Sequence, residues 1–180
     1  MRECEYCGRS IVQKNAQARY CSDKCRNYDR RRQQRTPIPQ ALIRRDRWIR
    51  YAPDKTPLRI NGRNASSTNP DTWSTYTDAV NSRAGVGLGF VLGDSIGCID
   101  LDHCLTGNQL TAGAAEFISH YPGHYIEVSP SGEGLHIWGH LDEQPGTRRA
   151  ENGLSVERYS TGRYITITGN VYQHGALLPL

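Results

Sequence analysis

Two aspartates, Asp100 and Asp102, stand one residue apart in the otherwise apolar stretch "IGCIDLDHCL". Successive side chains of a strand point to opposite faces, so both carboxylates would share one face, with Cα atoms roughly 6.5 Å apart, while Ile99 and Leu101 share the other. Two carboxylates in a partly dry site repel each other unless a cation, most simply a divalent metal ion, lies between them. The alternative is an edge strand with a solvated polar face. The spacing alone leaves both interpretations open.

The stretch "SPSGEGLHIWGHL" places a histidine, His136, directly after a glycine-bearing turn and on the polar face of a strand. The hydroxyl of Ser131 and the backbone N–H groups around Gly132 and Gly134 can hold phosphate oxygens, and the adjacent imidazole can add another donor. A single strand histidine is more often a half-buried polar residue, and a single glycine-rich turn is weak evidence. This candidate phosphate site therefore depends on its neighbours.

A third acid, Glu157, lies on the polar face of the strand expected in "LSVERYS", and Arg163 begins the next strand. An acid near Asp100 and Asp102 would complete a two-metal site, and a nearby arginine could neutralise the charge of a triphosphate. The alternative is an ordinary cross-strand ion pair between Glu157 and Arg163 at the surface.

Four cysteines near the N-terminus are spaced as two close pairs: Cys4-x2-Cys7-x13-Cys21-x3-Cys25. This spacing can bring four thiolates together tetrahedrally around a zinc ion and so fold a segment too short to build its own core. Disulfides, which a cytoplasmic protein disfavours, and coincidence are the alternatives. We predict a structural zinc site.

Basic charge is concentrated at the same end of the chain. Residues 1–50 hold 14 Lys and Arg against 5 Asp and Glu, a balance of +9, whereas the other 130 residues hold 8 against 13, a balance of −5. A basic segment gains affinity for polyanions by releasing condensed counterions, although a solvated helix face or linker would have a similar composition. We predict nucleic-acid contacts from the arginines after the cysteines: Arg26, Arg30, Arg31, Arg32 and Arg35.

The elements that position these residues follow from the pattern of the chain. The segment "TPIPQ" is typical of a linker and separates a basic zinc module, residues 1–36, from a body of residues 37–180. The body should hold short helices at 70–83 and 111–120. Three hairpins are expected, and they pair 85–93 with 96–105, 125–129 with 135–141, and 154–160 with 163–170. Strands and helices in this order predict an α+β fold, with a largely antiparallel sheet and flanking helices.

The length of 180 residues and a hydrophobic content of 37% suit one ordinary domain with a small appendage. No run of about 18 apolar residues is present, and the first residues lack the apolar segment of a secretory signal. We therefore expect a cytoplasmic protein of a bacterial or phage-infected cell, without membrane contact.

The order of "CIDLDHC", "EVSPSGEGLHIWG" and "SVERYSTGRYITITG" resembles the primase-polymerase domain of the archaeo-eukaryotic primase superfamily, in the form found in phage and mobile-element replication proteins. That family has an acidic pair on a strand, a small-residue-x-His motif and a third acid on a later strand. They correspond here to Asp100 with Asp102, to Gly134-Leu135-His136 and to Glu157. The resemblance covers roughly residues 42–170. Separately, "CEYCG" with "RYCSDKCR" resembles the treble-clef zinc fingers of nucleic-acid-associated proteins.

The resemblance implies an RRM-like palm and a DNA primase or polymerase that transfers nucleotides. Asp100, Asp102 and Glu157 would hold two Mg²⁺ or Mn²⁺ ions, which activate a hydroxyl and stabilise the pyrophosphate leaving group. His136, with Ser131, the turn glycines and Arg163, would bind the incoming nucleoside triphosphate. The zinc module and its arginines would hold a single-stranded DNA template.

Other functions remain open at this point. Members of this family commonly continue into a helical region and often a helicase, whereas the sequence ends at "GALLPL". We expect either a replicative helicase partner on a separate chain or a reduced relative. The latter would be a catalytically inactive, zinc-dependent nucleic-acid-binding regulator. A metal-dependent nuclease is a third function, because paired acids with a histidine also suit phosphodiester cleavage.

Overall fold

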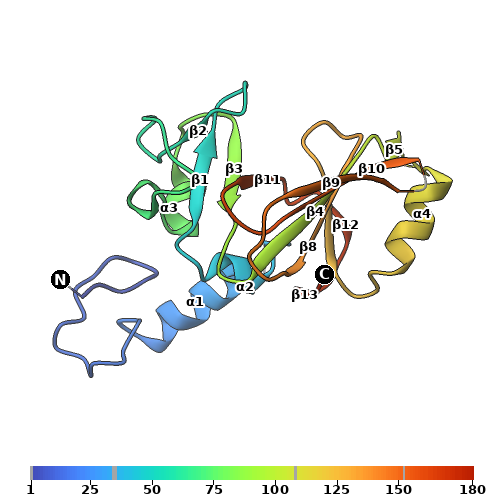
Figure 1. Cartoon of the computed structure of the whole chain (residues 1–180). Helices are drawn as coiled ribbons and strands as arrows, with labels where there is room; N and C mark the ends of the chain where they lie inside the picture. Colours follow the sequence, from blue (N-terminus) through green and yellow to red (C-terminus); the bar gives the residue numbers. More distant parts are fainter. Residues whose placement is uncertain (1, 34–35, 108, 152) are drawn as a thin grey trace. The chain divides into compact units, whose positions relative to one another are not determined.

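The computed structural model describes residues 2–33, 36–107, 109–151 and 153–180, and for residues 30–33 it describes the backbone alone. The chain divides into two compact units, Met1–Pro37 and Ile38–Leu180, each described by itself below. Figure 1 shows the course of the chain through both units.

The first unit consists of loops held against one helix, α1 (Asp23–Gln33). Ser22 caps this helix, because its hydroxyl accepts a hydrogen bond from the backbone N–H of Cys25 at 3.2 Å. Arg19 makes a two-pronged ion pair with Glu5, at 2.6 and 2.7 Å. Few apolar side chains are buried in this unit, so polar contacts and the cysteines must supply most of its stability.

In the described residues of the second unit, most strands form a four-stranded and a seven-stranded sheet. The smaller sheet has the order β11-β3-β1-β2, with strands Tyr164–Ile167, Gly87–Val91, Trp48–Tyr51 and Pro57–Leu58. The larger has the order β12-β7-β8-β4-β10-β9, with strands Val171–Gln173, Tyr125–Val128, Leu135–His140, Ile96–Asp102, Leu154–Tyr159 and Thr147–Glu151. β13 (Leu178–Pro179) adds to β8 in parallel, and β5 (Leu105–Thr106) pairs with β6 (Gln109–Leu110). The other pairings are antiparallel, so the predicted α+β class is confirmed.

Two predicted hairpins are wrong. β3 and β4 belong to different sheets, as do β10 and β11, although each pair is joined by a short turn. Phe90 and Leu92 before the first turn and Ile96 and Cys98 after it all enter one core, so these segments pack face to face instead of pairing edge to edge. The third predicted hairpin, β7 with β8, is confirmed.

Short helices complete the second unit: α2 (Gln40–Ile43), η1 (Pro70–Thr72), α3 (Tyr76–Asn81) and α4 (Ala112–Ser119). The helix predicted at 111–120 is therefore confirmed. The helix predicted at 70–83 is interrupted, because Ser74 exchanges two backbone hydrogen bonds with Trp48 of β1 and Thr75 caps a new helix. Among the described residues, no helix combines the length and the apolar character that crossing a membrane requires.

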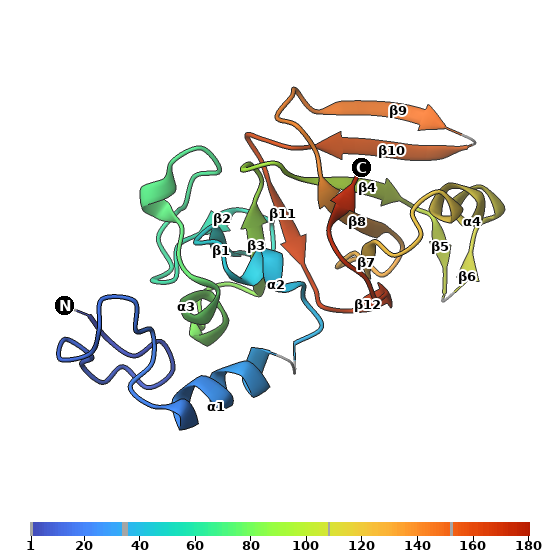
Figure 2. The ribbon, with the colours of Figure 1, turned by 90° about the horizontal axis from the view of Figure 1, so that it is seen from below.

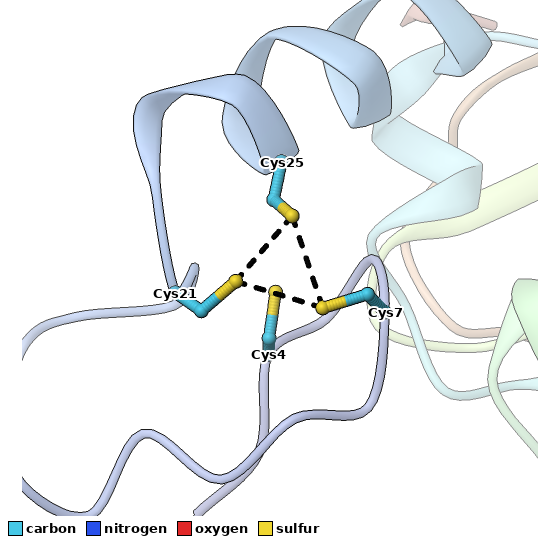
Figure 3. A group of neighbouring side chains, drawn as sticks. All are labelled: Cys4, Cys7, Cys21 and Cys25. Atoms are coloured by element: carbon cyan, nitrogen blue, oxygen red, sulfur yellow. Dashed lines mark hydrogen bonds between the residues drawn. The ribbon is translucent and has the colours of Figure 1, made fainter.

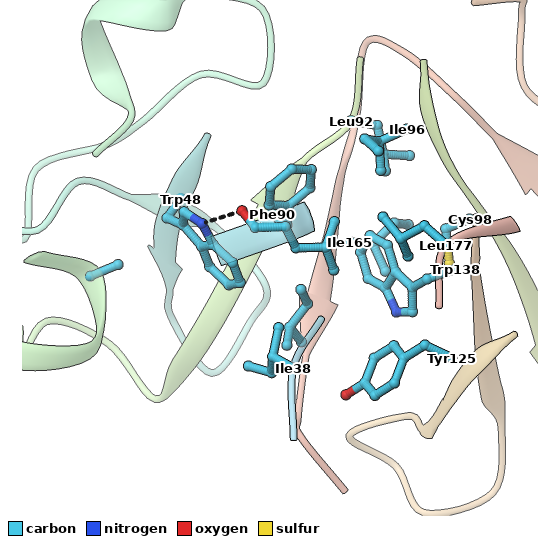
Figure 4. Packing of buried hydrophobic residues seen from close by; sticks show 13 residues of the cluster. Ile38, Trp48, Phe90, Leu92, Ile96, Cys98, Tyr125, Trp138, Ile165 and Leu177 are labelled. Atoms are coloured by element: carbon cyan, nitrogen blue, oxygen red, sulfur yellow. Dashed lines mark hydrogen bonds between the residues drawn. The ribbon is translucent and has the colours of Figure 1, made fainter. Parts of the chain in front are cut away.

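Both faces of the seven-stranded sheet are covered. On one face, Trp138 and Tyr125 pack toward Trp48, Phe90 and Ile165 of the four-stranded sheet, as Figure 4 shows. Each such large side chain contributes about 1.5–3 kcal/mol when fully buried. On the opposite face, the alternate residues pack with α4, which lies beside this sheet and away from the smaller one in Figure 2: Ile99, Leu101, Ile126, Leu135, Ile137 and Val156. The polar side chains described next share the first face.

Candidate active site and cysteine cluster

A row of polar residues crosses five neighbouring strands of the seven-stranded sheet. In register, Arg148 lies opposite Glu157, Glu157 opposite Asp100, Asp100 opposite His136, and His136 opposite Glu127. Residues opposite each other in antiparallel strands point to the same face. The fold therefore brings the predicted Asp100, His136 and Glu157 together, although they come from separate segments.

The two aspartates of β4 occupy the face predicted from strand alternation. Asp100 and Asp102 both line a cavity, whereas Ile99 and Leu101 are buried in the cluster with α4. Burial raises the pKa of Asp100, and the charges of Asp102 and Glu157 act in the same direction. Negative charge thus accumulates at this end of the row, as expected of a site that takes up a cation.

His136 lies between two carboxylates. Its Nε2 is 3.6 Å from Oδ1 of Asp100, and its Nδ1 is 3.5 Å from Oε1 of Glu127. The imidazole is nearly inaccessible to solvent, yet it still lines the cavity. Packing therefore places Nε2 toward Asp100 and Nδ1 toward Glu127, while the buried Nδ1 has no hydrogen-bond partner among the described residues.

Glu127 and Arg148 are the residues of this row that the sequence analysis missed, and Glu127 is the buried one. It is completely buried, and its Oε2 accepts hydrogen bonds from the Tyr125 hydroxyl (3.1 Å), the Thr168 backbone and hydroxyl (3.2 and 3.3 Å) and the Gly169 backbone (2.9 Å). Its Oε1 accepts one from the Trp138 indole at 3.3 Å. The sequence feature that could have identified Glu127 is a single acid within the apolar strand "YIEVS". An acid within an apolar stretch is also what singled out Asp100.

The cavity beside the row has a volume of about 440 Å³ and lies between the two sheets. This volume is within the roughly 300–1,000 Å³ typical of small-molecule sites. The seven-stranded sheet and its β7–β8 turn contribute Asp100, Asp102, Ser129, Pro130, Ser131 and His136. The other wall comes from the smaller sheet and its loops: Lys55, Pro57, Ser67, Gly162, Arg163, Tyr164, Ile165 and Thr166.

Lys55 and Ser67 were not predicted, because both lie in irregular segments without a chemical motif. The backbone carbonyl of Lys55 accepts a hydrogen bond from the hydroxyl of Tyr164, which fixes the loop at the cavity wall. Lys55 lies close enough for its charge to lower the pKa of Asp100, against the larger effect of burial. The cavity therefore carries cationic as well as anionic side chains.

The turn between β7 and β8 uses its backbone differently from the prediction. The N–H of Gly132 donates to the carbonyl of Ser129 at 2.9 Å, and that of Gly134 donates to the Ser129 hydroxyl at 3.2 Å. These two N–H groups are thus already bonded within the turn. Of the three turn residues predicted to bind phosphate, Ser131 lines the cavity, and Gly132 and Gly134 do not. Gly134 has a packing role, because a Cβ there would lie 2.7 Å from the carbonyl oxygen of Leu101.

Glu157 is held beside the cavity by three neighbours. Its carboxylate accepts a hydrogen bond from Tyr159 at 2.6 Å, and it lies 3.2 Å from Arg148 Nε and 3.9 Å from Arg163 Nη1. The guanidinium of Arg163 also stacks over the Tyr159 ring, 4.0 Å from its centre. The ion pair considered from sequence is present, while Arg163 also lines the cavity.

The donors of this site suit a hard divalent cation, since Asp100, Asp102 and Glu157 offer carboxylate oxygens. Their oxygens are more widely spaced than in a closed metal site. Among the described residues, the four cysteines are the one group of three or more metal-ligating side chains whose ligand atoms all lie within 4.8 Å of one another. Gathering the three acids around an ion would therefore require side-chain rotation, chiefly of Glu157 away from Arg148.

The four cysteines of the first unit converge as their spacing predicted (Figure 3). The Sγ atoms of Cys7, Cys21 and Cys25 lie 3.4–3.8 Å apart. A tetrahedral zinc–thiolate site has sulfur–sulfur distances of about 3.8 Å, so the cluster has the size of such a site. Burial raises the pKa of the Cys4 thiol, but hydrogen bonds from the backbone of Cys21, Cys7 and Tyr6 outweigh it and lower the pKa to about 6, which favours the metal-binding thiolate.

The predicted nucleic-acid-binding arginines are described in part. Arg26 lies on α1, is exposed and pairs with Asp23 at 3.0 Å. Arg30, Arg31 and Arg32 follow on the same helix, but their side chains lie outside the described part of the structure, and Arg35 lies outside the described residues altogether.

Comparison with known proteins adds independent information. No protein-family profile matches this chain. The chain is similar to a phage DNA primase-polymerase. That relative, from Nitratiruptor phage NrS-1, is 37% identical over 153 residues, which cover 76% of this chain and 21% of the phage protein. The chain thus spans about a fifth of the length of the relative. The relative is a protein of the kind that the order of the sequence motifs resembles.

Proposed function

We propose that this chain carries the nucleotidyl-transfer site of a DNA primase-polymerase, and that a nucleoside triphosphate binds in the cavity between the two sheets. The observation that carries the proposal is the in-register row of Glu157, Asp100 and His136, in which Asp100 and His136 line a cavity that Lys55 and Arg163 also line. The similarity to the phage enzyme supports the same reaction. In this proposal, the seven-stranded sheet is the palm.

Asp100, Asp102 and Glu157 would hold Mg²⁺ or Mn²⁺. Bound there, the ions would lower the pKa of the attacking hydroxyl and neutralise the charge that develops on the leaving pyrophosphate. His136 would donate from Nε2 to a phosphate oxygen, with the carboxylate of Glu127 on the Nδ1 side of the ring. Lys55 and Arg163 neutralise the rest of the triphosphate charge from the opposite wall.

The first unit would act as a structural zinc module that binds single-stranded template. Cys4, Cys7, Cys21 and Cys25 would hold the Zn²⁺, and the basic side of α1 would contact phosphates through Arg26 and the arginines that follow it. A replicative helicase on a separate chain is a further proposed partner.

The decisive test is a primer-independent synthesis assay with nucleoside triphosphates, Mn²⁺ or Mg²⁺ and a single-stranded template. We expect synthesis by the wild type and its loss in Asp102→Ala, with both proteins equally folded by thermal melting. Asp142→Asn, at an exposed acid between β8 and β9 that does not line the cavity, is the matched control and should leave synthesis unchanged. A wild-type protein that binds Mn²⁺ but makes no product would refute the catalytic proposal.

A second candidate is a catalytically silent, zinc-dependent nucleic-acid-binding regulator. The wide spacing of the three acids and the pairing of Glu157 with Arg148 favour it. In that case Cys4→Ser or Cys21→Ser would weaken DNA binding, whereas Asp102→Ala would change nothing measurable. Degradation of labelled DNA without nucleotides would instead indicate the nuclease.

A further inference from the structure

Two tyrosines of the first unit stack on each other at its surface. Tyr6 lies in the turn between Cys4 and Cys7, and Tyr28 lies on α1, three residues after Cys25. Their ring centres are 5.7 Å apart and their planes differ by 19°. Although they contact each other, Tyr6 remains 37% exposed and Tyr28 41% exposed. A unit with so little buried apolar surface thus leaves two of its largest aromatic rings accessible.

The third tyrosine of this unit, Tyr20, differs from this pair in that its hydroxyl is hydrogen-bonded within the fold. The Tyr20 hydroxyl donates to Asp29 at 2.7 Å, and burial together with this hydrogen bond raises the pKa of Tyr20 well above its usual value. In the described part of the chain, by contrast, neither the Tyr6 nor the Tyr28 hydroxyl has a hydrogen-bond partner. Their position is therefore set by stacking and by the neighbouring cysteines.

The surroundings of the pair are basic. The ammonium group of Lys24 lies 5.8 Å from the centre of the Tyr28 ring, and Arg26 is on the same helix. Residues 1–37 contain 10 Lys and Arg against 4 Asp and Glu, a balance of +6. Accessible aromatic rings surrounded by positive charge are the combination that binds single-stranded nucleic acid, because bases stack on the rings while cations contact the phosphates.

We propose that Tyr6 and Tyr28 form a stacking platform for an unpaired base of single-stranded DNA, with Lys24 contacting the adjacent phosphate. This inference rests on the proposed function, in which the first unit binds template, and it adds a residue-level mode of binding. Cys7 and Cys25 hold the two tyrosines together, so the platform depends on an intact cysteine cluster. Stacking tolerates every base, so the platform would bind template without reading its sequence.

The test compares binding of a labelled thymidine oligonucleotide with binding of an abasic oligonucleotide of the same length and charge, using the full chain loaded with zinc. We expect the wild type to prefer the oligonucleotide that has bases. Tyr6→Ala and Tyr28→Ala should each bind it about 5- to 100-fold more weakly. They should bind the abasic strand as the wild type does, and Tyr28→Phe should restore affinity.

Salt dependence separates stacking from charge. Lys24→Ala should reduce the slope of log affinity against log salt by about 0.7, because one phosphate contact is lost, whereas Tyr28→Ala should leave the slope unchanged. Tyr172→Ala, at an equally exposed tyrosine of the second unit, is the matched control. Zinc content and thermal melting establish that each variant is folded.

Two results overturn the platform. One is that folded, zinc-loaded Tyr6→Ala and Tyr28→Ala bind the thymidine strand as tightly as the wild type. The other is a wild type that binds the two strands equally. In either case, synthesis that still depends on Asp102 would leave the proposed function intact. The opposite outcome is a wild type that binds the strands with the expected preference but makes no product. It would refute the proposed catalysis and leave the platform supported.

Discussion

Replacing Glu127 with alanine removes a carboxylate that joins both sheets and His136. Its donors come from β7 and β8 of the larger sheet, through Tyr125 and Trp138, and from the segment that follows β11 of the smaller sheet, through Thr168 and Gly169. Among the described residues, the Thr168 hydroxyl is the donor of this group with a second acceptor, the Val128 carbonyl at 2.8 Å. The substitution therefore tests whether a single buried acid organises the site.

The magnitude follows from which donors can reach water afterwards. Thr168 is exposed and Gly169 partly so, and both can bond to solvent. The Tyr125 hydroxyl and the Trp138 indole are fully buried, and His136 nearly so. Each buried donor left without an acceptor costs about 1–3 kcal/mol, so loss of the bonds from Tyr125 and Trp138 costs about 2–6 kcal/mol together. This is a large part of the roughly 5–15 kcal/mol that stabilises a typical domain.

Urea denaturation followed by tryptophan fluorescence measures this loss. Glu127→Gln provides the finer comparison, because it keeps the size and one acceptor oxygen but places an amide N–H₂ group among donors. We expect a loss of about 1–3 kcal/mol for this variant. We also expect a drop in the maximal rate of synthesis beyond what its folded fraction explains, because the negative charge 3.5 Å from Nδ1 of His136 is lost. Glu116→Ala, at an exposed acid of α4, is the matched control. An alanine variant within about 1 kcal/mol of the wild type, or a glutamine variant with unchanged kinetics, would show that this reasoning is wrong.

Three further changes test other parts of the structure. Gly134→Ala should lower the free energy of unfolding by about 1–3 kcal/mol in urea denaturation, since its Cβ would lie 2.7 Å from the Leu101 carbonyl; an unchanged midpoint would contradict this. Asp100→Asn should raise the melting temperature of the metal-free protein, because burial and neighbouring acids disfavour the charge, as the raised pKa of Asp100 indicates; it should also abolish any stabilisation by Mn²⁺. Cys21→Ser should release zinc, measured with a colorimetric chelator, and reduce the helical circular-dichroism signal of α1 while leaving the tryptophan fluorescence of the second unit intact.

The parts of the site that could be predicted are those fixed by local chemistry. Strand alternation placed Asp100 and Asp102 opposite Ile99 and Leu101, because the period of two operates within a few residues. The β7–β8 hairpin was predictable from its turn residues, and the cysteine cluster from its spacing. These predictions need no knowledge of what lies beside the segment.

Glu127 and Lys55 could not be predicted in this way. An acid in a strand lies at the surface unless donors from other segments surround it. Four of the five hydrogen bonds to Glu127 come from residues at least 11 positions away in the sequence: one from Trp138, two from Thr168 and one from Gly169. Lys55 reaches the cavity because its loop is bonded to Tyr164, more than a hundred residues later. Both roles arise from contacts that no local pattern contains.

The wrong hairpin at residues 154–170 shows how such contacts decide function. Had β10 and β11 paired in one sheet, Arg163 would have been a cross-strand partner of Glu157 and an ordinary surface ion pair. Instead, the turn carries the chain from the larger sheet to the smaller one, so Glu157 stays in the row with Asp100 while Arg163 joins the opposite wall of the cavity. The two residues remain 3.9 Å apart, although they belong to different sheets and Arg163 lines the cavity. A bound triphosphate with its cations could then draw Glu157 and Arg163 to opposite partners, and that separation is what a transfer site built on this row requires.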